Sequence, residues 1–411
     1  MFPANPTANP RSNNQPIIIV GGGFGGFRVA YRLSKQRRRL KRPILLIDKH
    51  RHHVYTPLLY EVASGCTTGV EAETRLIRGA AFRFEDALKS CCDVAFMRGE
   101  AAALDPAART LRLKDGTSLA YHTLVLALGS ETEFFGIPGL REHALTLKTR
   151  QDALDIRRRV EMLLTKSQGS RKNGALRLVV GGGGATGTEF AAEMSGCFHA
   201  MERRGALRRG SWEITLVEAT GRLLGMLKPE LSSFAKHRLE KRGVKVMLDT
   251  CFKTIENGTV MIAPRPLKPG EDPGALACDL APGSEQRLSA DLVVWTGGVR
   301  GPNVFKTFNL PLDGKDRLLV DPSLRVQGQK NIYALGDCAS LVHPKTKAPV
   351  PCLAQSALRE AGVAAANILA DLGLKTARRE YAFPVYSAVV PLGGKHALAA
   401  IGPFTFKGFF G

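Results

Sequence analysis

Two glycine-rich turns, each followed by an acidic residue, are the features of this sequence whose spacing points to chemistry. In the first turn, Gly21, Gly23 and Gly26 fit the pattern GxGxxG directly after the β-branched run at residues 17–20. The first glycine of this pattern allows a sharp turn, the second lets the backbone approach a pyrophosphate, and the third lets a helix pack on a strand. The phosphate then lies at a helix N-terminus, where free N–H groups and the helix dipole favour negative charge.

A carboxylate follows the first turn at a useful distance. Asp48 comes 22 residues after Gly26, at the end of the apolar run 44–47, where it can bond the hydroxyl groups of a ribose. A lone GxGxxG is often only a tight turn. Here a strand pattern precedes it, a segment of helical composition follows it, and the acid is correctly spaced. We therefore predict a dinucleotide site at this turn.

The second turn has one glycine more than the pattern needs, so its register is ambiguous. Gly182, Gly184 and Gly187 fit best, which leaves Gly181 as the last residue of a strand that begins at Leu176. This register gives the second turn the same order of parts as the first, and it predicts a second dinucleotide site.

Glu218 is the ribose-level acid of the second turn, because it ends the apolar run 214–217. A carboxylate there repels a 2′-phosphate and favours NAD(H) over NADP(H). The alternative is a solvated glutamate at a strand end. Two such sites imply two dinucleotides, and one nicotinamide with one flavin is the economical pairing, since hydride passes between stacked rings.

The elements that must position these residues occur twice along the chain, in the order strand, glycine turn, helix, strand, acid. Alternation of strands and helices predicts parallel sheets covered on both faces, so the fold class is α/β with two doubly wound Rossmann-like domains. We also expect strands at 124–128, 292–295 and 332–334, and helices at 150–165 and 354–372.

Composition excludes several classes of protein. The chain has 411 residues, 44% hydrophobic and 23% charged, which favours packed domains and excludes wholesale disorder. Its 58 Lys and Arg against 37 Asp and Glu give a net charge of +21, which predicts attraction to an anionic partner. No apolar run is long enough to span a bilayer. The eight cysteines include no CxxC pair, so we expect no metal site and reduced thiols.

Several blocks of sequence together resemble a known family. The most specific is HHVYTPLLYEVA at residues 52–63, which follows the first turn and Asp48. The other landmarks, spread over residues 17 to 402, are Tyr121–Ser130, Phe135–Gly139, Gly182–Glu189, Trp295–Val299, Ile332–Asp337 and Ala354-Gln355. These blocks resemble the type II NADH:quinone oxidoreductases, single-chain FAD enzymes of the flavoprotein superfamily with two dinucleotide-binding domains.

The resemblance implies roles for particular residues. FAD would bind the first turn, with Asp337 at its ribityl region, Thr56-Pro57 near its isoalloxazine and a helix N-terminus at Ala354-Gln355 near its pyrimidine end. The residues implied for FAD are Gly21, Gly23, Phe24, Gly25, Gly26, Asp48, Thr56, Pro57, Gly129, Gly336, Asp337, Ala354 and Gln355. Those implied for NADH are Gly182, Gly184, Gly187, Glu189, Glu218, Gly297 and Gly298. Glu189, in the NADH and quinone pocket, and Gln355 are the catalytic candidates.

The resemblance also implies a domain plan and a reaction. A disordered tail (1–15) precedes an FAD domain (16–150) that resumes at 297–380, an NADH domain (151–296) is inserted in it, and a C-terminal segment (381–411) stops before the family's membrane-binding helices. NADH would give hydride to FAD, and two electrons would pass to a membrane quinone without proton pumping. The expected location is peripheral, on the anionic cytoplasmic face of the inner membrane, and a homodimer is compatible with it.

Some alternatives stay open. The family's quinone motif reads AQxxxQ, but Arg359 stands at its second glutamine, which favours a soluble flavin-dependent NAD(P)H oxidoreductase with a non-quinone acceptor. A non-catalytic flavoprotein that uses NADH as a redox signal is a third class. Nucleic-acid binding is not expected, because the basic runs lack interleaved aromatics. His52-His53 are either surface or pocket residues, and Cys91-Cys92 are either ordinary thiols or a redox pair.

Overall fold

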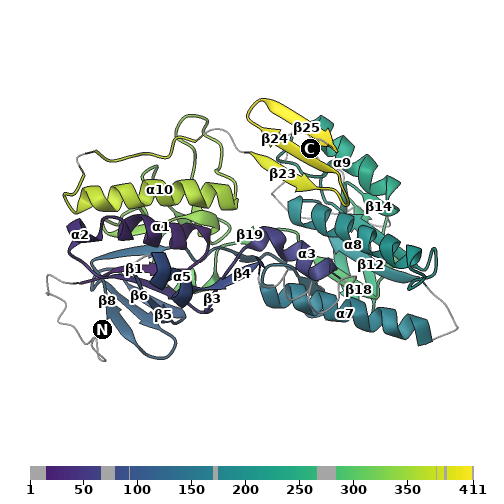
Figure 1. The fold of residues 1–411 in the computed structure, drawn as a ribbon, viewed down its shortest axis with the longest axis horizontal. Coiled ribbons are helices and arrows are strands. Elements are labelled where there is room, and N and C mark those ends of the chain that lie inside the picture. The colour runs from purple at the N-terminus through teal and green to yellow at the C-terminus, as the bar shows by residue number, and fades with distance from the viewer. Residues whose placement is uncertain are drawn as a thin grey trace. The chain divides into compact units, whose positions relative to one another are not determined.

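The computed structural model describes residues 15–65, 79–91, 93–169, 175–265, 284–375, 377–383 and 387–409. They form two compact units, shown in Figure 1, which are treated separately below. The first unit comprises Met1–Val54, Ala81–Glu131 and Val299–Tyr386, and the second comprises Tyr55–Ala80, Thr132–Gly298 and Ser387–Gly411. Apart from Gln15, the predicted N-terminal tail lies outside the described residues, as does Cys92 of the vicinal pair.

A five-stranded parallel sheet forms the centre of the first unit. Its order is β21 (Ile332–Ala334), β9 (Thr123–Leu126), β1 (Ile17–Val20), β2 (Ile44–Asp48) and β5 (Ala95–Arg98). All four residues of β1 are buried, as expected for a strand in a parallel sheet covered on both faces. Helices α1 (Phe24–Ser34) and α10 (Ala354–Asp371) pack side by side along it (Figure 1).

A second five-stranded parallel sheet forms the centre of the second unit. Its order is β11 (Ala144–Thr146), β18 (Leu292–Trp295), β12 (Leu176–Gly181), β13 (Trp212–Val217) and β14 (Val244–Met247). Helices α7 (Arg150–Gly169), α8 (Ala185–Arg203) and α9 (Pro229–Lys241) pack around it. In both sheets the strand that precedes the glycine turn is central.

Smaller elements complete each unit. In the first they are α2 (Arg37–Leu40), β3 (His52–Val54), β4 (Ala81–Arg83), α5 (Phe84–Cys91), β6 (Ala101–Asp105), β7 (Thr110–Leu113), β8 (Ser118–Ala120), β19 (Val299–Arg300), η2 (Asn303–Thr307), β20 (Leu318–Leu319), η3 (Gly336–Cys338) and β22 (Ala339–Ser340). In the second they are η1 (Thr56–Leu58), α3 (Leu59–Ser64), α6 (Leu140–His143), β15 (Thr250–Glu256), β16 (Thr259–Pro264), β17 (Gln286–Ser289), β23 (Ala388–Pro391), β24 (Ala397–Ile401) and β25 (Phe404–Gly408). A two-residue strand, β10 (Glu131–Thr132), falls at a boundary between the units.

The α/β fold class with two parallel, Rossmann-like sheets is confirmed, and each expected strand is present within one or two residues. The compact units, however, divide the chain at other places than the sequence-based domain bounds. Residues 55–65 pack in the second unit because α3 buries Leu59 and Val62 and contacts α7 and α8, and residues 132–150 join it through the contacts of α6 and β11. The C-terminal segment from Ser387 also joins the second unit, since β23 contacts α8.

Two further findings bear on the sequence-based expectations. No helix in the described part of the chain is both long and apolar enough to cross a membrane. Cys251, Cys338 and Cys352 are free thiols, whereas Cys197 on α8 is disulfide-bonded, which differs from the expectation of reduced thiols throughout.

Candidate dinucleotide sites

The first glycine turn joins β1 to α1, and at two of its positions a Cβ would strike the backbone. Gly21 has a φ of +101°, and a Cβ there would lie 2.2 Å from the carbonyl oxygen of Ala127. A Cβ at Gly26 would lie 1.9 Å from the carbonyl oxygen of Gly21. The sharp turn and the close packing of α1 on β1 therefore both need glycine.

The space at the Cβ position of Gly23 is open, in contrast to that of Gly21 and Gly26. It is the N-cap of α1, and a Cβ built on it would meet no atom within 4 Å. No side chain caps this helix end, and its first turn contains no acidic residue. The free N–H groups and the helix dipole therefore face an open side, and this cradle fits the pyrophosphate of a dinucleotide.

Asp48 and His53 both bond to Gly22 and so brace the first turn. The N–H of Gly22 donates a hydrogen bond to Oδ2 of Asp48 at 2.7 Å, which places the carboxylate beside the turn. His53 is only 6% exposed, and its Nδ1 lies 2.8 Å from the carbonyl oxygen of Gly22. Its ring stacks on Phe82 at 4.7 Å and meets the edge of Phe24. Burial lowers the pKa of His53, so the ring is held neutral and donates Nδ1–H to Gly22.

Two loops that follow neighbouring strands add further polar groups in the first unit. Gly129, after β9, has a φ of +72° and open space at its Cβ position. The hydroxyl of Ser130 donates to Oδ2 of Asp337 at 2.8 Å. The N–H of Gly336 donates to Oε2 of Glu360 at 2.5 Å, and burial raises the pKa of this carboxyl, which is 3% exposed, to about 7.

Helix α10 begins at Ala354 and Gln355 with an uncapped N-terminus. No side chain caps its first turn, and that turn contains no acidic residue. The 18-residue helix therefore presents a positive dipole end. One turn further, the guanidinium of Arg359 lies 5.0 Å from the ring centroid of Phe383.

The second turn repeats the geometry of the first, position by position. Strand β12 ends at Gly181, Gly182 has a φ of +101°, and Gly184 is the open N-cap of α8. A Cβ at Gly187 would lie 2.0 Å from the carbonyl oxygen of Gly182. Gly182, Gly184 and Gly187 thus occupy the places that Gly21, Gly23 and Gly26 occupy in the first unit, which resolves the register of the turn.

Glu218 closes the second turn as Asp48 closes the first. The N–H of Gly183 donates to its Oε2 at 2.5 Å, while the N–H and hydroxyl of Thr220 donate to its Oε1 at 2.8 and 2.7 Å. The carboxylate is therefore held at the end of β13, next to the turn. Its negative charge there disfavours a ligand with a 2′-phosphate.

The loop after β18 backs the second turn. The hydroxyl of Thr296 donates to the carbonyl oxygens of Gly181 at 2.9 Å and Gly182 at 3.1 Å. A Cβ at Gly182 would come within 2.8 Å of Gly297, and one at Gly298 would come within 2.5 Å of the Phe135 ring. Because β12 lies between β13 and β18, the turn stands where the strand order reverses, which is where open α/β sheets bind ligands.

Glu189 lies near the start of α8, among other carboxylates. Burial, together with the charge of Glu61 on α3, raises the pKa of Glu189 to about 8. Burial also raises the pKa of Glu193, one turn further along. The hydroxyl of Tyr60 donates to Oε1 of Glu61 at 3.0 Å. With a pKa of about 8, Glu189 holds a proton at neutral pH and is able to release it.

Thr56 and Pro57, two of the residues expected at the flavin, are exposed residues of η1, which belongs to the second unit. The first glycine turn belongs to the first unit. The approach of Thr56 and Pro57 to the flavin therefore stays a prediction.

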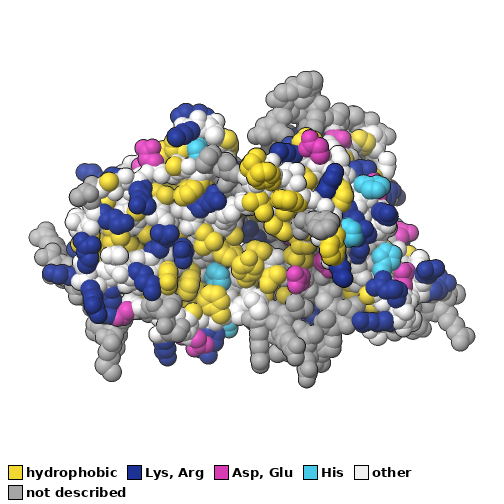
Figure 2. Space-filling model, turned by 45° about the horizontal axis from the view of Figure 1, so that its top comes forward, with side chains coloured by type: hydrophobic (Ala, Val, Ile, Leu, Met, Phe, Trp, Pro, Cys, Tyr) yellow, Lys and Arg dark blue, Asp and Glu magenta, His cyan; other side chains and the backbone are white. Residues whose placement is uncertain are grey.

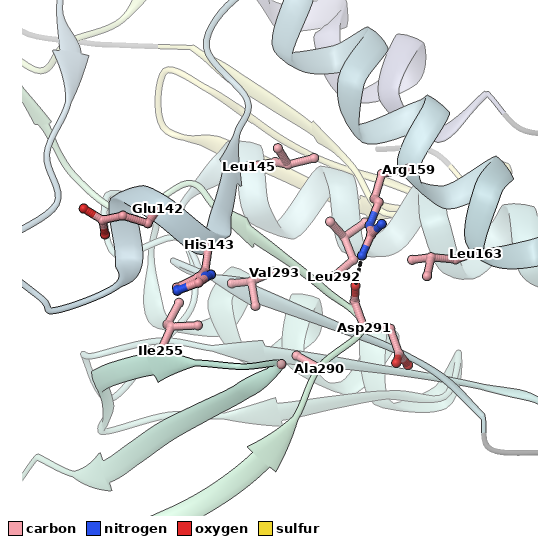
Figure 3. Close-up of a pocket in the computed structure, with 11 residues that line it drawn as sticks. Glu142, His143, Leu145, Arg159, Leu163, Ile255, Ala290, Asp291, Leu292 and Val293 are labelled. Carbon is pink, nitrogen blue, oxygen red and sulfur yellow. Dashed lines mark hydrogen bonds between the residues drawn. The ribbon is translucent and has the colours of Figure 1, made fainter.

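A cavity of about 480 Å³ lies elsewhere in the second unit, and Figure 3 shows its lining. Arg159 of α7 reaches across it and donates to the carbonyl oxygen of Asp291 at 3.5 Å. Asp291 precedes β18, so the cavity is at the amino end of this strand. Parallel sheets bind their ligands at the carboxyl ends, and we do not assign a dinucleotide to this cavity.

Of the two readings of His53, surface or pocket, the structure supports a buried position, because the side chain is 6% exposed. Three other residues that brace the turns and their loops were not singled out in the sequence, namely Ser130, Thr296 and Glu360. A signal was present for two of them, since Ser130 and Thr296 adjoin glycines that follow strands. Glu360 had no local signal. Among the described residues, no group of three His, Cys, Asp or Glu side chains is arranged to hold a metal ion.

The fold and the duplicated turns define a class of α/β proteins with two Rossmann-like units. The family model described as pyridine nucleotide-disulphide oxidoreductase matches residues 15–361, and the chain belongs to this family.

Individual proteins are similar to this chain over most of its length. The chain is 27% identical over 375 residues to a type II NADH:quinone oxidoreductase of Staphylococcus aureus (strain NCTC 8325 / PS 47), a match that covers 90% of this chain and 86% of the relative. The structure of NDH2 from Plasmodium falciparum in complex with NADH is similar, with a TM-score of 0.82, 19% identity, and 96% and 92% of the two chains covered. The sulfide:quinone oxidoreductase from Aquifex aeolicus has a TM-score of 0.75 with 20% identity, covering 96% and 87%.

Proposed function

We propose that this oxidoreductase uses FAD to take hydride from NADH and to pass two electrons to a quinone, without pumping protons. The observation that carries the proposal is the duplication of one geometry, in which a turn amide bonds the acid at the end of the next strand. Gly22 bonds Asp48 in one unit, and Gly183 bonds Glu218 in the other. A relative named type II NADH:quinone oxidoreductase, aligned over most of both chains, supports the choice of substrates.

FAD is assigned to the first unit because this unit has polar groups beyond the turn. The N-terminus of α1 and Asp48 would hold the pyrophosphate and ribose, while Asp337, oriented by Ser130, would hold the ribityl hydroxyls. The uncapped N-terminus of α10 at Gln355 supplies a positive dipole for negative charge on the flavin. When bound, the flavin supplies a centre that accepts hydride from NADH and returns two electrons to the acceptor.

NADH is assigned to the second unit. The open N-terminus of α8 at Gly184 would bind its pyrophosphate, and Glu218 would bind the adenosine ribose. Gly297 and Gly298 lie next to the turn, and both positions need glycine because a Cβ there would strike the rings of Trp295 and Phe135. NADPH is disfavoured because its 2′-phosphate would meet the Glu218 carboxylate.

We assign Glu189 the role of a proton donor in quinone reduction. Reduction of a quinone to a quinol consumes two protons, whereas hydride transfer from NADH delivers only one. With a pKa of about 8, Glu189 is protonated at neutral pH and is matched to proton transfer near that pH. Its role is to hold and release a proton at its carboxyl oxygen.

We also propose that the chain associates peripherally with an anionic membrane surface on the cytoplasmic side. Its net charge of +21 supports this, because basic residues near an anionic leaflet each contribute about 1 kcal/mol. Figure 2 shows Lys and Arg side chains spread over the visible face and far fewer Asp and Glu. A homodimer is compatible with the proposal, and binding of nucleic acid is not part of it.

An anaerobic experiment tests the reaction. The purified yellow protein is mixed with stoichiometric NADH, and a water-soluble ubiquinone analogue follows while the flavin absorbance is recorded. We expect rapid bleaching by NADH, much slower bleaching by NADPH as the matched control, and rapid recovery with the quinone. Bleaching without recovery would rule out the quinone, and no bleaching would rule out the nicotinamide site.

One observation favours a second candidate, an NAD(P)H oxidoreductase with a non-quinone acceptor. Arg359 replaces the second glutamine of the family's quinone motif, and its guanidinium lies over Phe383. A cation at this position suits an anionic acceptor. Recovery with an anionic oxidant such as ferricyanide, but not with the quinone, would favour this candidate.

A further inference from the structure

A second cavity, of about 630 Å³, lies in the first unit and is not part of either glycine turn. Helices α1 and α10 supply most of its walls, and residues 379–383 supply the rest. Figure 1 shows these two helices side by side. Its lining residues are Arg28, Arg32, Gln355, Leu358, Arg359, Gly362, Val363, Arg379, Glu380, Ala382 and Phe383.

Four guanidinium groups from three segments line this cavity. Arg28 and Arg32 lie one turn apart on α1, Arg359 lies on α10, and Arg379 comes from the segment after that helix. One carboxylate, that of Glu380, lines the cavity with them. Within the described residues, no carboxylate forms an ion pair with Arg28, Arg32 or Arg379. Four guanidinium groups and one carboxylate thus give the cavity lining a surplus of positive charge.

The cavity also has an apolar side. Phe383 is 42% exposed and Leu358 is 40% exposed, so both side chains have apolar surface that a ligand could cover. Gly362 allows one of the cations to approach α10, because a Cβ at this position would lie 3.4 Å from Cζ of Arg32. Cationic and apolar groups therefore line one space of the size that small ligands occupy.

We propose that this cavity binds an amphiphilic organic phosphate, with the phosphate on the arginines and the apolar part on Phe383 and Leu358. Guanidinium groups match phosphate oxygens in pairs, so several of them around one space favour phosphate over a single carboxylate. Phe383 and Leu358 favour a ligand that also has an apolar group, which inorganic phosphate lacks. This cavity lies outside the two glycine turns, but Gln355 and Arg359 of the AQxxxQ motif belong to its lining, so it adjoins the place proposed for the electron acceptor.

Titration calorimetry on the flavin-loaded protein, with NAD+ in excess to fill the second turn, tests the binding chemistry. The probe is dihexanoyl phosphatidic acid below its micelle concentration. Glycerol 3-phosphate lacks the apolar part, and dihexanoyl phosphatidylcholine lacks the net negative charge. We expect the first probe to bind at least tenfold more tightly than either of the others. Equal affinity for all three, or no binding, would overturn the proposal.

Matched variants locate the site. Arg32→Ala and Arg379→Ala each remove one lining guanidinium and are expected to weaken phosphatidic acid binding about tenfold. Arg38→Ala removes the same charge from an exposed position on α2, outside the cavity, and should leave the affinity unchanged. Phe383→Ser should weaken binding of phosphatidic acid but not of glycerol 3-phosphate. Equal losses in the Arg32, Arg379 and Arg38 variants would show general attraction to a basic surface and would overturn the proposal.

The ligand chemistry has two sources, a membrane lipid or a free organic phosphate. Flotation with phosphatidylcholine vesicles that contain phosphatidic acid separates them. A loss of vesicle binding in Arg32→Ala, but not in Arg38→Ala, assigns the lipid source. Soluble binding without an Arg32-dependent effect on vesicles assigns the free phosphate. These measurements do not use NADH turnover, so their failure is distinguishable from failure of the proposed reaction.

Discussion

Gly23→Ala and Gly26→Ala add the same methyl group to the first turn, but we expect them to impair different properties of the protein. Gly26→Ala places a methyl group 1.9 Å from the carbonyl oxygen of Gly21, a backbone atom. Gly23→Ala places it in open space at the N-cap of α1, where a φ of −67° suits any residue. We expect the first change to damage folding and the second to damage ligand binding.

The magnitudes follow from these distances. Contacts of a real Cβ below 3.0 Å are essentially unknown, so Gly26→Ala requires a shift of about 1 Å between α1 and β1. The Gly21 backbone is fixed by its N–H bond to Ile47 at 2.8 Å and cannot move freely. Overpacking of this kind costs about 3 kcal/mol or more. Gly23→Ala should leave apoprotein stability unchanged or raise it by about 0.5 kcal/mol, because alanine restricts the unfolded chain.

Two assays separate the outcomes. Urea denaturation of the apoproteins measures the free energy of unfolding, and quenching of FAD fluorescence measures flavin affinity. Gly23→Ala should fold normally but bind FAD at least tenfold more weakly, since its methyl group occupies the space next to the pyrophosphate. The second turn supplies an internal control, because Gly184→Ala should weaken NADH binding and leave FAD binding intact. Full FAD affinity in Gly23→Ala, or normal stability in Gly26→Ala, would refute this account of the turns.

Three further predictions concern side chains beside the turns. In the wild type, the rate of quinone reduction measured by stopped flow should fall above pH about 8, and Glu189→Gln should remove this pH dependence. The folded carboxyl keeps its proton up to about that pH, so the free energy of unfolding of the wild type should fall as pH rises from about 4.5 to 8. Urea titrations of the variant should lack this fall. Glu218→Arg should shift the ratio of NADPH affinity to NADH affinity about tenfold or more towards NADPH. Unchanged affinities for NADPH and NADH would contradict the role of Glu218 in this selection. His53→Ala should lower apoprotein stability by about 1–3 kcal/mol, since it leaves the Gly22 carbonyl unpaired, and an unchanged denaturation midpoint would contradict the bracing role.

Local patterns were sufficient to predict the strands and turns. A β-branched run that stops at glycine has few other conformations, and this explains why β1 and β12 begin at the expected residues. The register of the second turn was only the best fit in the sequence, and the structure resolves it, because Gly182 and Gly187 lie where a Cβ would strike the backbone. Helix α10 followed from small residues at helical spacing.

Contacts between distant residues could not be predicted in this way. Ser130 and Asp337 are 207 positions apart, and neither residue type indicates the other. The raised pKa of Glu189 depends on burial and on Glu61, which comes from another helix. The same reason explains the domain bounds, since residues 59–64 follow the first turn in sequence but bury their apolar face against helices of the second unit. Sequence proximity carries no information about which core a short amphipathic helix joins.

The near identity of the two turns has a consequence for specificity. Because both turns have the same open N-cap, the same crowded glycines and the same bond from an amide to an acid, neither turn by itself selects one dinucleotide over another. Selection must come from the loops on the other side of each central strand. In the first unit these loops bring Asp337 and the buried Glu360 close to Gly336, and among the described residues of the second unit the loop after β18 brings Thr296 and two glycines. The unit with more polar groups beyond its turn suits the ligand with more hydroxyls, and this is the physical basis for assigning the flavin to the first unit.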